Sequence, residues 1–313
     1  MVDSNRSRLT RLGIAIAIGA ASGIFTYVCF RSPGSSSTPS DFAYWWTASR
    51  ILAHGGDPYA LHPGSEGWPL PDPLFYPLPA LFPILPLAWL PLPVAGAAFT
   101  GLSGGLLAWF LAREGAHRLW MFASAPYVVA LKVGQCSPIL LAAAFVPALG
   151  WLLPWKPPIG LPAFLYRPTR TAALLAATVI AASFIVLPGW FAGWRANLAE
   201  LEFHPAPLLT WAGPLLFLAV IRWRSPEGRV FLAMICVPQS LFFADQLPLQ
   251  MVARSRRQSA VLAAASLVAF GAWYFCLRPG DLYVQRAAPW VLALVYLPAL
   301  GVLLFGRKPT AVP

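Results

Sequence analysis

The residues that could do chemistry gather in one polar stretch near the start of the chain. Asp41 opens this stretch, Arg50 follows, and a tight turn carries Asp57 and Tyr59, with several aromatic residues in between. A carboxylate takes up a proton from a reacting hydroxyl. A guanidinium binds a phosphate through paired hydrogen bonds. Because a long apolar run precedes the stretch, this combination predicts a reaction site for a polar substrate that is carried on a lipid.

The composition indicates that this site belongs to a membrane protein. The 313 residues are 58% hydrophobic and 11% charged, whereas a soluble domain carries about 25% charged residues. The apolar runs cover 12–30, 94–112, 138–153, 171–188, 207–221, 230–243, 258–276 and 287–305. We therefore expect a single integral membrane domain over 1–313. It should be all-α and polytopic, with roughly nine to eleven transmembrane or re-entrant helices.

The net charge of +11 follows the membrane topology. Basic residues lie mainly in short segments between the apolar runs: Arg6, Arg8 and Arg11; Arg113 and Arg118; Arg167 and Arg170; Arg222, Arg224 and Arg229; Arg307 and Lys308. Cytoplasmic loops of membrane proteins are enriched in this way. The pattern predicts a multi-pass protein of the inner (plasma) membrane with a cytoplasmic N-terminus, and it argues against nucleic acid as a partner.

Two longer polar segments, 31–73 and 189–206, are then expected on the outer, periplasmic face. Within the first, Asp41–Ala53 reads as a short amphipathic helix on the membrane surface, with Ser40 as its N-cap. The prolines of 74–93 predict a broken or re-entrant element, because proline interrupts a helix. The four cysteines form no paired motif and no carboxylate cluster suits a metal ion, so we expect neither a metal nor a cofactor.

Polar residues also interrupt later apolar runs. Gln135 and Lys156 each stand beside helix-breaking residues, and Asp245 ends another run. A lysine at membrane depth costs roughly 2.5–3.5 kcal/mol or more unless it reaches water or a partner. We expect Lys156 to line the cavity of the lipid-carried donor, so its replacement by methionine should weaken donor use and keep or raise stability, because a desolvated charge is removed. Asp245 and Arg254 are too close in sequence for a spanning helix between them, since nine residues of helix cover about 14 Å.

Several short motifs, taken in order, resemble one known family. They are Asp41-Phe42, Arg50-x-Leu52, Gly56-Asp57-Pro58-Tyr59, Phe75-Tyr76-Pro77, Gly134-Gln135, Lys156-Pro157 and Pro238-x-Ser240 with Asp245. Together they are similar to glycosyltransferase family 87, which comprises polyprenyl-phosphate-sugar-dependent mannosyltransferases and relatives in the GT-C membrane superfamily. The chain is a shortened version of that pattern, and Gln239 lies near the position where the family commonly has a histidine.

The resemblance implies a GT-C-like helical bundle with a defined reaction. A hexose, mannose or a relative, would pass from a polyprenyl-phosphate sugar to a lipid or glycan acceptor at the outer face, with inversion and no cofactor. Asp41 would be the general base, whereas the residues alone also allow it to cap the helix that follows. Membrane lipids would surround the protein as further partners. The side chains implied at the substrates are Tyr44, Arg50, Asp57, Tyr59, Tyr76, Gln135, Lys156, Gln239 and Asp245.

The departing phosphate would need a cation beside it. The candidates are Arg50, Lys132, Lys156, Arg195 and His204. Simpler roles stay open for several residues: Arg50 snorkels to the surface, Asp57 forms a turn, Gln135 caps a broken helix, and Asp245 pairs with a basic residue.

Two other functions fit the same sequence. A polytopic transporter or lipid flippase also contains broken helices and buried charges, and a degenerate family member would lack activity. Position discriminates between them. In an enzyme, Asp41, Gln135, Lys156 and Asp245 should converge on one outward-facing cavity, whereas in a transporter the polar residues should line a path near the midplane.

Overall fold

The computed structural model describes residues 5–32, 40–201, 204–277 and 285–306, which form helices and contain no strand. The α-helices are α1 (Asn5–Arg31), α2 (Asp41–Ala53), α3 (Leu92–Glu114), α4 (Ala125–Val133), α5 (Ser137–Ala143), α6 (Pro157–Tyr166), α7 (Arg170–Val186), α8 (Trp190–Ala199), α9 (Gly213–Leu216), α10 (Pro226–Cys236), α11 (Arg256–Cys276), α12 (Ala288–Val291) and α13 (Leu297–Phe305). Short 3-10 helical segments and one wider π-helical segment join them: η1 (Leu78–Ala80), η2 (Leu85–Leu87), η3 (Ala116–Ala123), η4 (Pro147–Trp155), η5 (Pro207–Leu209), η6 (Phe217–Arg222), η7 (Phe243–Val252), η8 (Gln285–Ala287) and the π-helical η9 (Leu292–Tyr296).

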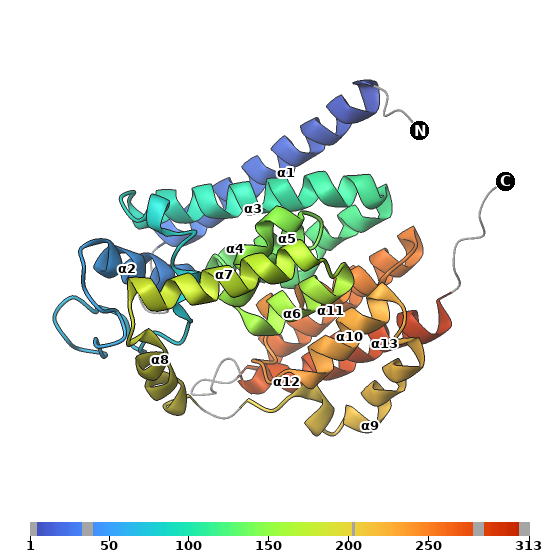
Figure 1. Cartoon of the computed structure of the whole chain (residues 1–313). Coiled ribbons are helices and arrows are strands. Elements are labelled where there is room, and N and C mark those ends of the chain that lie inside the picture. The colour runs from blue at the N-terminus through green and yellow to red at the C-terminus, as the bar shows by residue number, and fades with distance from the viewer. Residues whose placement is uncertain (1–4, 33–39, 202–203, 278–284, 307–313) are drawn as a thin grey trace.

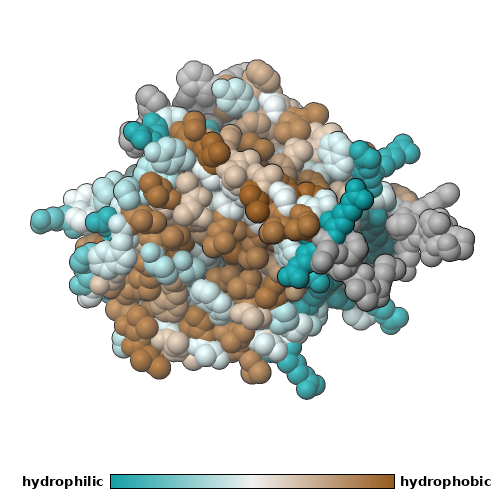
Figure 2. Space-filling model, turned by 90° about the horizontal axis from the view of Figure 1, so that it is seen from above, coloured by the Kyte–Doolittle hydropathy of each residue, from teal (hydrophilic) through white to brown (hydrophobic). Residues whose placement is uncertain are grey.

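The lengths and composition of these helices are those of a helical membrane protein. Four helical stretches are long and apolar enough to span a membrane: Arg6–Arg31, Leu92–Glu114, Arg256–Cys276 and Ala288–Phe305. The pairs α4–α5 and α7–α8 are sharply bent and raise the number to six if each pair is one span. Most other expected spans are therefore broken into short pieces. Apolar residues spread across the middle of one face, and hydrophilic residues gather toward its edges (Figure 2).

Two ends of the bundle have different character. The α2 end consists of α2, the segment 54–91 and α8, which lie together on the left of Figure 1. The opposite, arginine-rich end holds Arg118, whose Nη1 donates to Met251 O at 2.6 Å, and Arg254, whose Nη2 lies 2.5 Å from Glu227 Oε2. Helices α1 and α3 run side by side between the two ends (Figure 1).

Helix α2 has the bounds that the sequence predicts. Ser40 Oγ accepts a hydrogen bond from Ala43 N at 3.3 Å, so Ser40 is the N-cap. Phe42, Trp45 and Ala48 are fully buried, whereas Arg50 is exposed, so one side of α2 packs into the protein and its position at the membrane surface stays a prediction. These side chains pack against the segment that follows η1 and against α3, since α2 is apolar on more than one face. The helix is thereby fixed within the protein.

The break between α4 and α5 brings a polar turn against α2. The two helices meet at an angle of 114°. Gly134 forms the corner in a left-handed conformation with φ +66°, and a Cβ there would lie 2.6 Å from Phe42 Cβ. Only glycine accepts both this conformation and this approach without strain. The corner places the next residue, Gln135, beside the start of α2.

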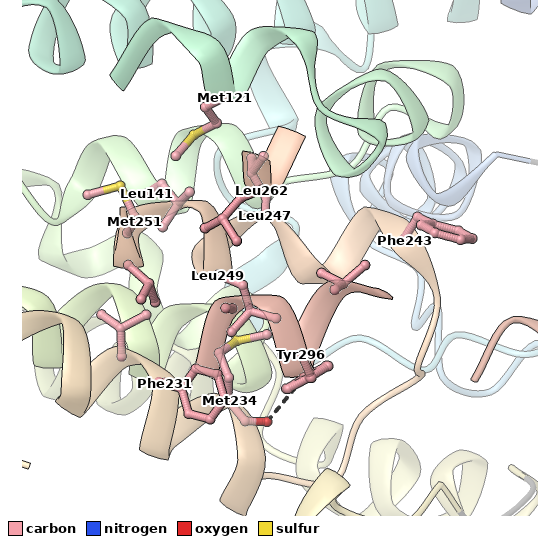
Figure 3. Packing of buried hydrophobic residues seen from close by; sticks show 14 of the residues in the cluster. Met121, Leu141, Phe231, Met234, Phe243, Leu247, Leu249, Met251, Leu262 and Tyr296 are labelled. Carbon is pink, nitrogen blue, oxygen red and sulfur yellow. Dashed lines mark hydrogen bonds between the residues drawn. The ribbon is translucent and has the colours of Figure 1, made fainter. Parts of the chain in front are cut away.

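The short segment η7 lies inside the protein. All ten of its residues are buried, and their side chains form part of the core that includes Phe231, Met234 and Tyr296 (Figure 3). A tight helix of this length covers about 20 Å, at roughly 2 Å per residue. It explains how a short chain joins Asp245 to Arg254: the connection runs through protein, where neighbouring helices replace lipid contacts.

Glycines allow α1 and α3 to approach closely. A Cβ on Gly19 would lie 2.8 Å from Gly101 O, and one on Gly23 would lie 2.9 Å from Ala97 O. Small residues at such crossings permit the backbones to touch, which favours packing between membrane helices.

We expect Gly19→Val to destabilise the protein by about 1–3 kcal/mol, because the added atoms must push the helices apart. The matched control is Gly13→Val, since Gly13 lies on the same helix and a Cβ there meets nothing within 4 Å. Equilibrium unfolding in mixed detergent measures both variants. Equal losses in the two variants would mean that the close crossing contributes little.

Candidate functional site

Polar side chains from separate parts of the chain meet at the α2 end. Asp41 is the first residue of α2, Gln135 is at the α4–α5 corner, and Tyr76 precedes η1. Lys156 lies between η4 and α6, and Asp245 lies on η7. We refer to these residues as the carboxylate–lysine cluster. They come from distant segments of the chain, and none of them lines either of the two grooves beside α2.

The carboxylate of Asp41 is hydrogen-bonded to a residue from another part of the chain and not to the backbone of α2. Gln135 Nε2 donates a hydrogen bond to Asp41 Oδ2, and the Tyr76 side chain lies close enough to influence the pKa of the same carboxylate. Since Ser40 provides the cap of α2, the carboxylate of Asp41 is not needed for capping. It is available to accept a proton.

The amide of Gln135 has a fixed orientation. Gln135 Oε1 accepts hydrogen bonds from Cys136 N at 2.9 Å and Cys136 Sγ at 3.1 Å. The NH₂ group must therefore point toward Asp41, where it favours the ionised carboxylate. The side chain supports Asp41 and does not merely cap a broken helix.

Lys156 and Asp245 form an ion pair inside the protein. Lys156 Nζ lies 2.7 Å from Asp245 Oδ1, and the two side chains are 16% and 6% exposed. The ammonium also lies 5.8 Å from the centre of the Tyr76 ring. Ser137 Oγ donates to Ala244 O at 3.0 Å, which ties the start of α5 to η7 next to Asp245. The lysine is thus paired, so its removal leaves a buried carboxylate behind.

Burial and neighbouring charges set the protonation states of the cluster. Burial raises the pKa of Asp41 above the usual range, and this effect outweighs the nearby ammonium of Lys156. Burial alone would lower the pKa of Lys156, but the carboxylates of Asp245 and Asp41 raise it overall. The lysine therefore stays charged, and Asp41 takes up a proton more readily than an exposed aspartate.

Aromatic rings form one wall of the cluster. Trp45 contacts Tyr76 and Trp155, with ring centres 5.0 Å and 4.9 Å apart. The indole nitrogens of Trp45 and Trp155 are buried and have no hydrogen-bond partner among the described residues. Trp45 therefore belongs to the interior and not to an interfacial belt. This wall keeps the local dielectric low, which strengthens the electrostatic effects described above.

The segment that carries Tyr76 is clamped from two sides. Tyr59 Oη donates to Tyr76 O at 2.8 Å, and Asp57 Oδ1 accepts from Tyr59 N at 2.8 Å. From α8, Trp194 Nε1 donates to Phe75 O at 2.9 Å and Asn197 Nδ2 donates to Leu74 O at 3.1 Å. Asp57 and Tyr59 therefore support the cluster through Tyr76, as residues of a turn.

Sequence analysis missed the contribution of α8 to this clamp. The spacing of Trp194 and Asn197, three residues apart, places both on one face of the helix. That spacing was the available signal. No pattern in the sequence indicates that this face meets the segment 74–76, because the contact is between distant parts of the chain.

Other predicted site residues lie elsewhere. Tyr44 Oη donates to Asp72 Oδ2 at 2.8 Å, and Gln239 Nε2 donates to Met234 O at 2.5 Å. Arg50 follows Asp41 by nine residues, which is about 180° around a helix, so it points away from the cluster. Lys132 and Arg195 are exposed. Lys156 is therefore the cation that the structure brings to Asp41.

Among the residues that the structure describes, no group of three or more histidine, cysteine, aspartate or glutamate side chains is placed to hold a metal ion. The chemistry that the cluster can do by itself is acid–base and electrostatic. A buried carboxylate that Gln135 orients can act as a proton acceptor, and a charged ammonium such as that of Lys156 can neutralise an anion.

Comparisons with known proteins give no relative. No family model, no curated protein and no solved structure matches the chain.

We expect Lys156→Met to lower the free energy of unfolding by about 3 kcal/mol, because breaking a buried pair leaves Asp245 without its partner. This reverses the effect expected for an unpaired lysine. Adding Asp245→Asn to Lys156→Met should cost less than the sum of the two single changes. Equilibrium unfolding in mixed detergent measures the three variants.

The control is Glu114→Gln, which breaks the ion pair with Arg167 at the arginine-rich end. That pair has a similar length of 2.8 Å, but its side chains are more exposed, at 23% for Glu114 and 48% for Arg167. Its removal should change stability by less than about 1 kcal/mol. If Lys156→Met is as stable as Glu114→Gln, the buried pair does not stabilise the protein.

Proposed function

We propose that this protein is a membrane-embedded glycosyltransferase. It would move a hexose such as mannose from a polyprenyl-phosphate sugar to a hydroxyl of a lipid or glycan acceptor, with inversion at the anomeric carbon. The observation that carries the proposal is the carboxylate–lysine cluster, in which a proton acceptor and a cation converge from distant segments. Since no family model matches, the motif resemblance is secondary support.

In the proposed mechanism, the residues divide the work of one displacement. The acceptor hydroxyl loses its proton to Asp41 as its oxygen forms a bond to the anomeric carbon. The bond from that carbon to the phosphate oxygen breaks, and its electron pair leaves with the phosphate. Lys156 neutralises the developing charge on the departing phosphate, a stabilisation that is strong where water is excluded.

Asp245 has a positioning role in this proposal. It holds the ammonium of Lys156 at 2.7 Å while the site is empty. A phosphate that enters would share the ammonium with Asp245 or take it over. With Asp41 and Asp245 ionised and Lys156 protonated, the site carries one net negative charge. When Asp41 takes the proton of the acceptor hydroxyl, this negative charge is removed, and the site repels the departing phosphate less.

The topology is part of the same proposal. Arg118, Arg167 and Arg254 lie at the arginine-rich end, which would be cytoplasmic by the distribution of charge. The cluster and the segments over it would then face the outside, with the bundle arranged like that of GT-C enzymes. A lipid-carried donor would reach such a site from within the membrane. The acceptor would approach from water or from the same leaflet.

We expect Asp41→Asn to abolish sugar transfer, with a loss of at least about 10²–10⁴-fold, because the amide cannot take the proton. The measurement is transfer of labelled hexose from a polyprenyl-phosphate donor by the purified full-length protein. Asp72→Asn is the matched control, since Asp72 lies in the same loop region but is exposed and bonds Tyr44. Turnover by Asp41→Asn comparable to that of Asp72→Asn would rule out Asp41 as the base.

The pH dependence of transfer should report the burial of Asp41. The reaction needs the ionised carboxylate, so kcat/KM falls as pH drops through a pKa that burial raises above the usual range. Gln135→Leu removes a donor to the charged form, which raises this pKa further. We expect the acid limb of the profile to move to higher pH by roughly half to one pH unit.

A second glutamine controls for the loss of an amide. Gln258 Oε1 accepts from Arg254 N at 2.7 Å at the arginine-rich end, far from Asp41 in the fold. Gln258→Leu should leave the acid limb unchanged. A limb that stays in place in Gln135→Leu, or moves to lower pH, would show that Gln135 does not stabilise the ionised carboxylate.

A further inference from the structure

Two grooves lie beside the C-terminal half of α2 and meet at Gly56. The first has a volume of about 440 Å³ and is apolar, with Leu52, Phe82, Leu85 and Leu187 in its wall. The second has a volume of about 640 Å³ and is lined by Trp46, Arg50 and His54. Gly56 lines both. Neither groove contains a residue of the carboxylate–lysine cluster.

The second groove is cationic. Arg50 is exposed, and its guanidinium stacks 4.7 Å from the centre of the Trp46 ring. It forms no ion pair within the part of the chain that the structure describes. Of the described residues that line this groove, none is acidic. A stacked guanidinium leaves its N–H edge open, and that edge matches a phosphate.

His54 adds a second polar edge. Its Nδ1 lies 2.7 Å from Arg50 O, and a carbonyl oxygen only accepts, so Nδ1 carries the hydrogen. The other ring nitrogen, Nε2, is left for a ligand. The ring of His54 lies 5.4 Å from that of Trp89, whose side chain is 68% exposed. Arg50, His54 and Trp89 therefore present polar and aromatic groups at one place.

The first groove opens where candidate spans end. Leu187 directly follows α7, and Trp89 and Leu90 directly precede α3, which begins at Leu92. Trp46 Nε1 donates to Leu90 O at 3.0 Å and ties α2 to this level. Tryptophans are enriched where a membrane meets water. With α3 and the bent pair α7–α8 as membrane spans, the cationic groove would lie at headgroup depth and the apolar groove beside it where lipid chains begin.

We propose that the two grooves form a binding site for an anionic phospholipid of the leaflet on the α2 side. The phosphate of its headgroup would contact Arg50, Nε2 of His54 would accept a hydrogen bond from a headgroup hydroxyl, and the start of the acyl chain would lie against Leu52, Leu85 and Leu187. Gly56 lines both grooves, and a Cβ there would lie 2.8 Å from Ile51 Cγ2 on α2. The site is separate from Asp41, which is on the opposite side of α2.

The test is lipid binding to the delipidated full-length protein in detergent, measured by native mass spectrometry. The probes are phosphatidylglycerol and phosphatidylcholine with the same short chains. We expect the wild-type protein to bind phosphatidylglycerol about tenfold more tightly, as a charge-assisted contact to phosphate would give. Arg50→Gln should lose this preference and keep its affinity for phosphatidylcholine.

Two further variants separate the parts of the site. Arg31→Gln is the matched control. Arg31 is the last residue of α1, it is also exposed, and its guanidinium lies 5.6 Å from the centre of the Tyr27 ring. It lines neither groove and should keep the preference. Leu85→Gln should weaken the binding of both lipids by the same factor, because it alters the groove wall that faces the acyl chain.

Several results would overturn the proposal. Equal binding of the two lipids by the wild-type protein would show that no headgroup is recognised. An equal loss of preference in Arg31→Gln and Arg50→Gln would reduce the effect to general charge. Displacement of phosphatidylglycerol by inorganic phosphate alone, with equal affinity, would make the groove a site for a free anion. None of these measurements requires transferase activity, so they stand apart from the proposed function.

Discussion

Burying an unpaired ammonium or an unpaired carboxylate in an apolar bundle raises the free energy of the folded state. The ion pair of Lys156 with Asp245 offsets this free energy for both groups. Lys156 ends an interrupted apolar run, and Asp245 lies near the start of η7, a segment that is buried along its whole length. Bringing the two together requires η7 to run inside the bundle and not along lipid. A buried pair of this kind contributes little net stability against apolar residues of the same size, but it strongly penalises any structure in which the partners separate. It therefore selects one arrangement of the helices around it.

The rest of the α2 end follows from that arrangement. With η7 fixed, the α4–α5 corner lies between it and α2, and Gln135 reaches Asp41. The segment with Tyr76 closes the other side, held by the turn at Tyr59 and by α8. Buried groups on different elements are thus mutually oriented before any ligand arrives. Such pre-organisation is what electrostatic stabilisation of a departing anion requires.

Much of this could be predicted from the sequence, because the signals were local. Ser40 as a cap, the end of α2 near Gly55 and the interruption at Gly134 are short-range features, and the structure has them. Asp41, Gln135, Lys156 and Asp245 were named because charges and amides are rare in an apolar chain. Their mutual contacts were not predictable, since no pattern in one sequence gives distances between distant segments.

Other differences have specific physical reasons. The burial of α2 was missed because its apolar residues, Phe42, Trp45 and Ile51 among them, lie on more than one face, which a surface helix does not need. Arg50 was grouped with Asp41 by proximity in sequence, although helical geometry puts it on the other side. The expected number of spans was too high, because each apolar run was counted as a span, whereas prolines and the corner at Gly134 divide several runs into short helices.

The most direct measurement is consumption of the donor by the purified full-length protein. Polyprenyl phosphates that carry different labelled hexoses are each incubated with the protein and with a membrane lipid and glycan extract as the source of acceptor. We predict that at least one donor is converted to free polyprenyl phosphate, with the sugar recovered on an acceptor in the inverted configuration. If every donor stays intact, although lipid binding shows that the protein is folded, the cluster does not catalyse sugar transfer and the proposed function is wrong.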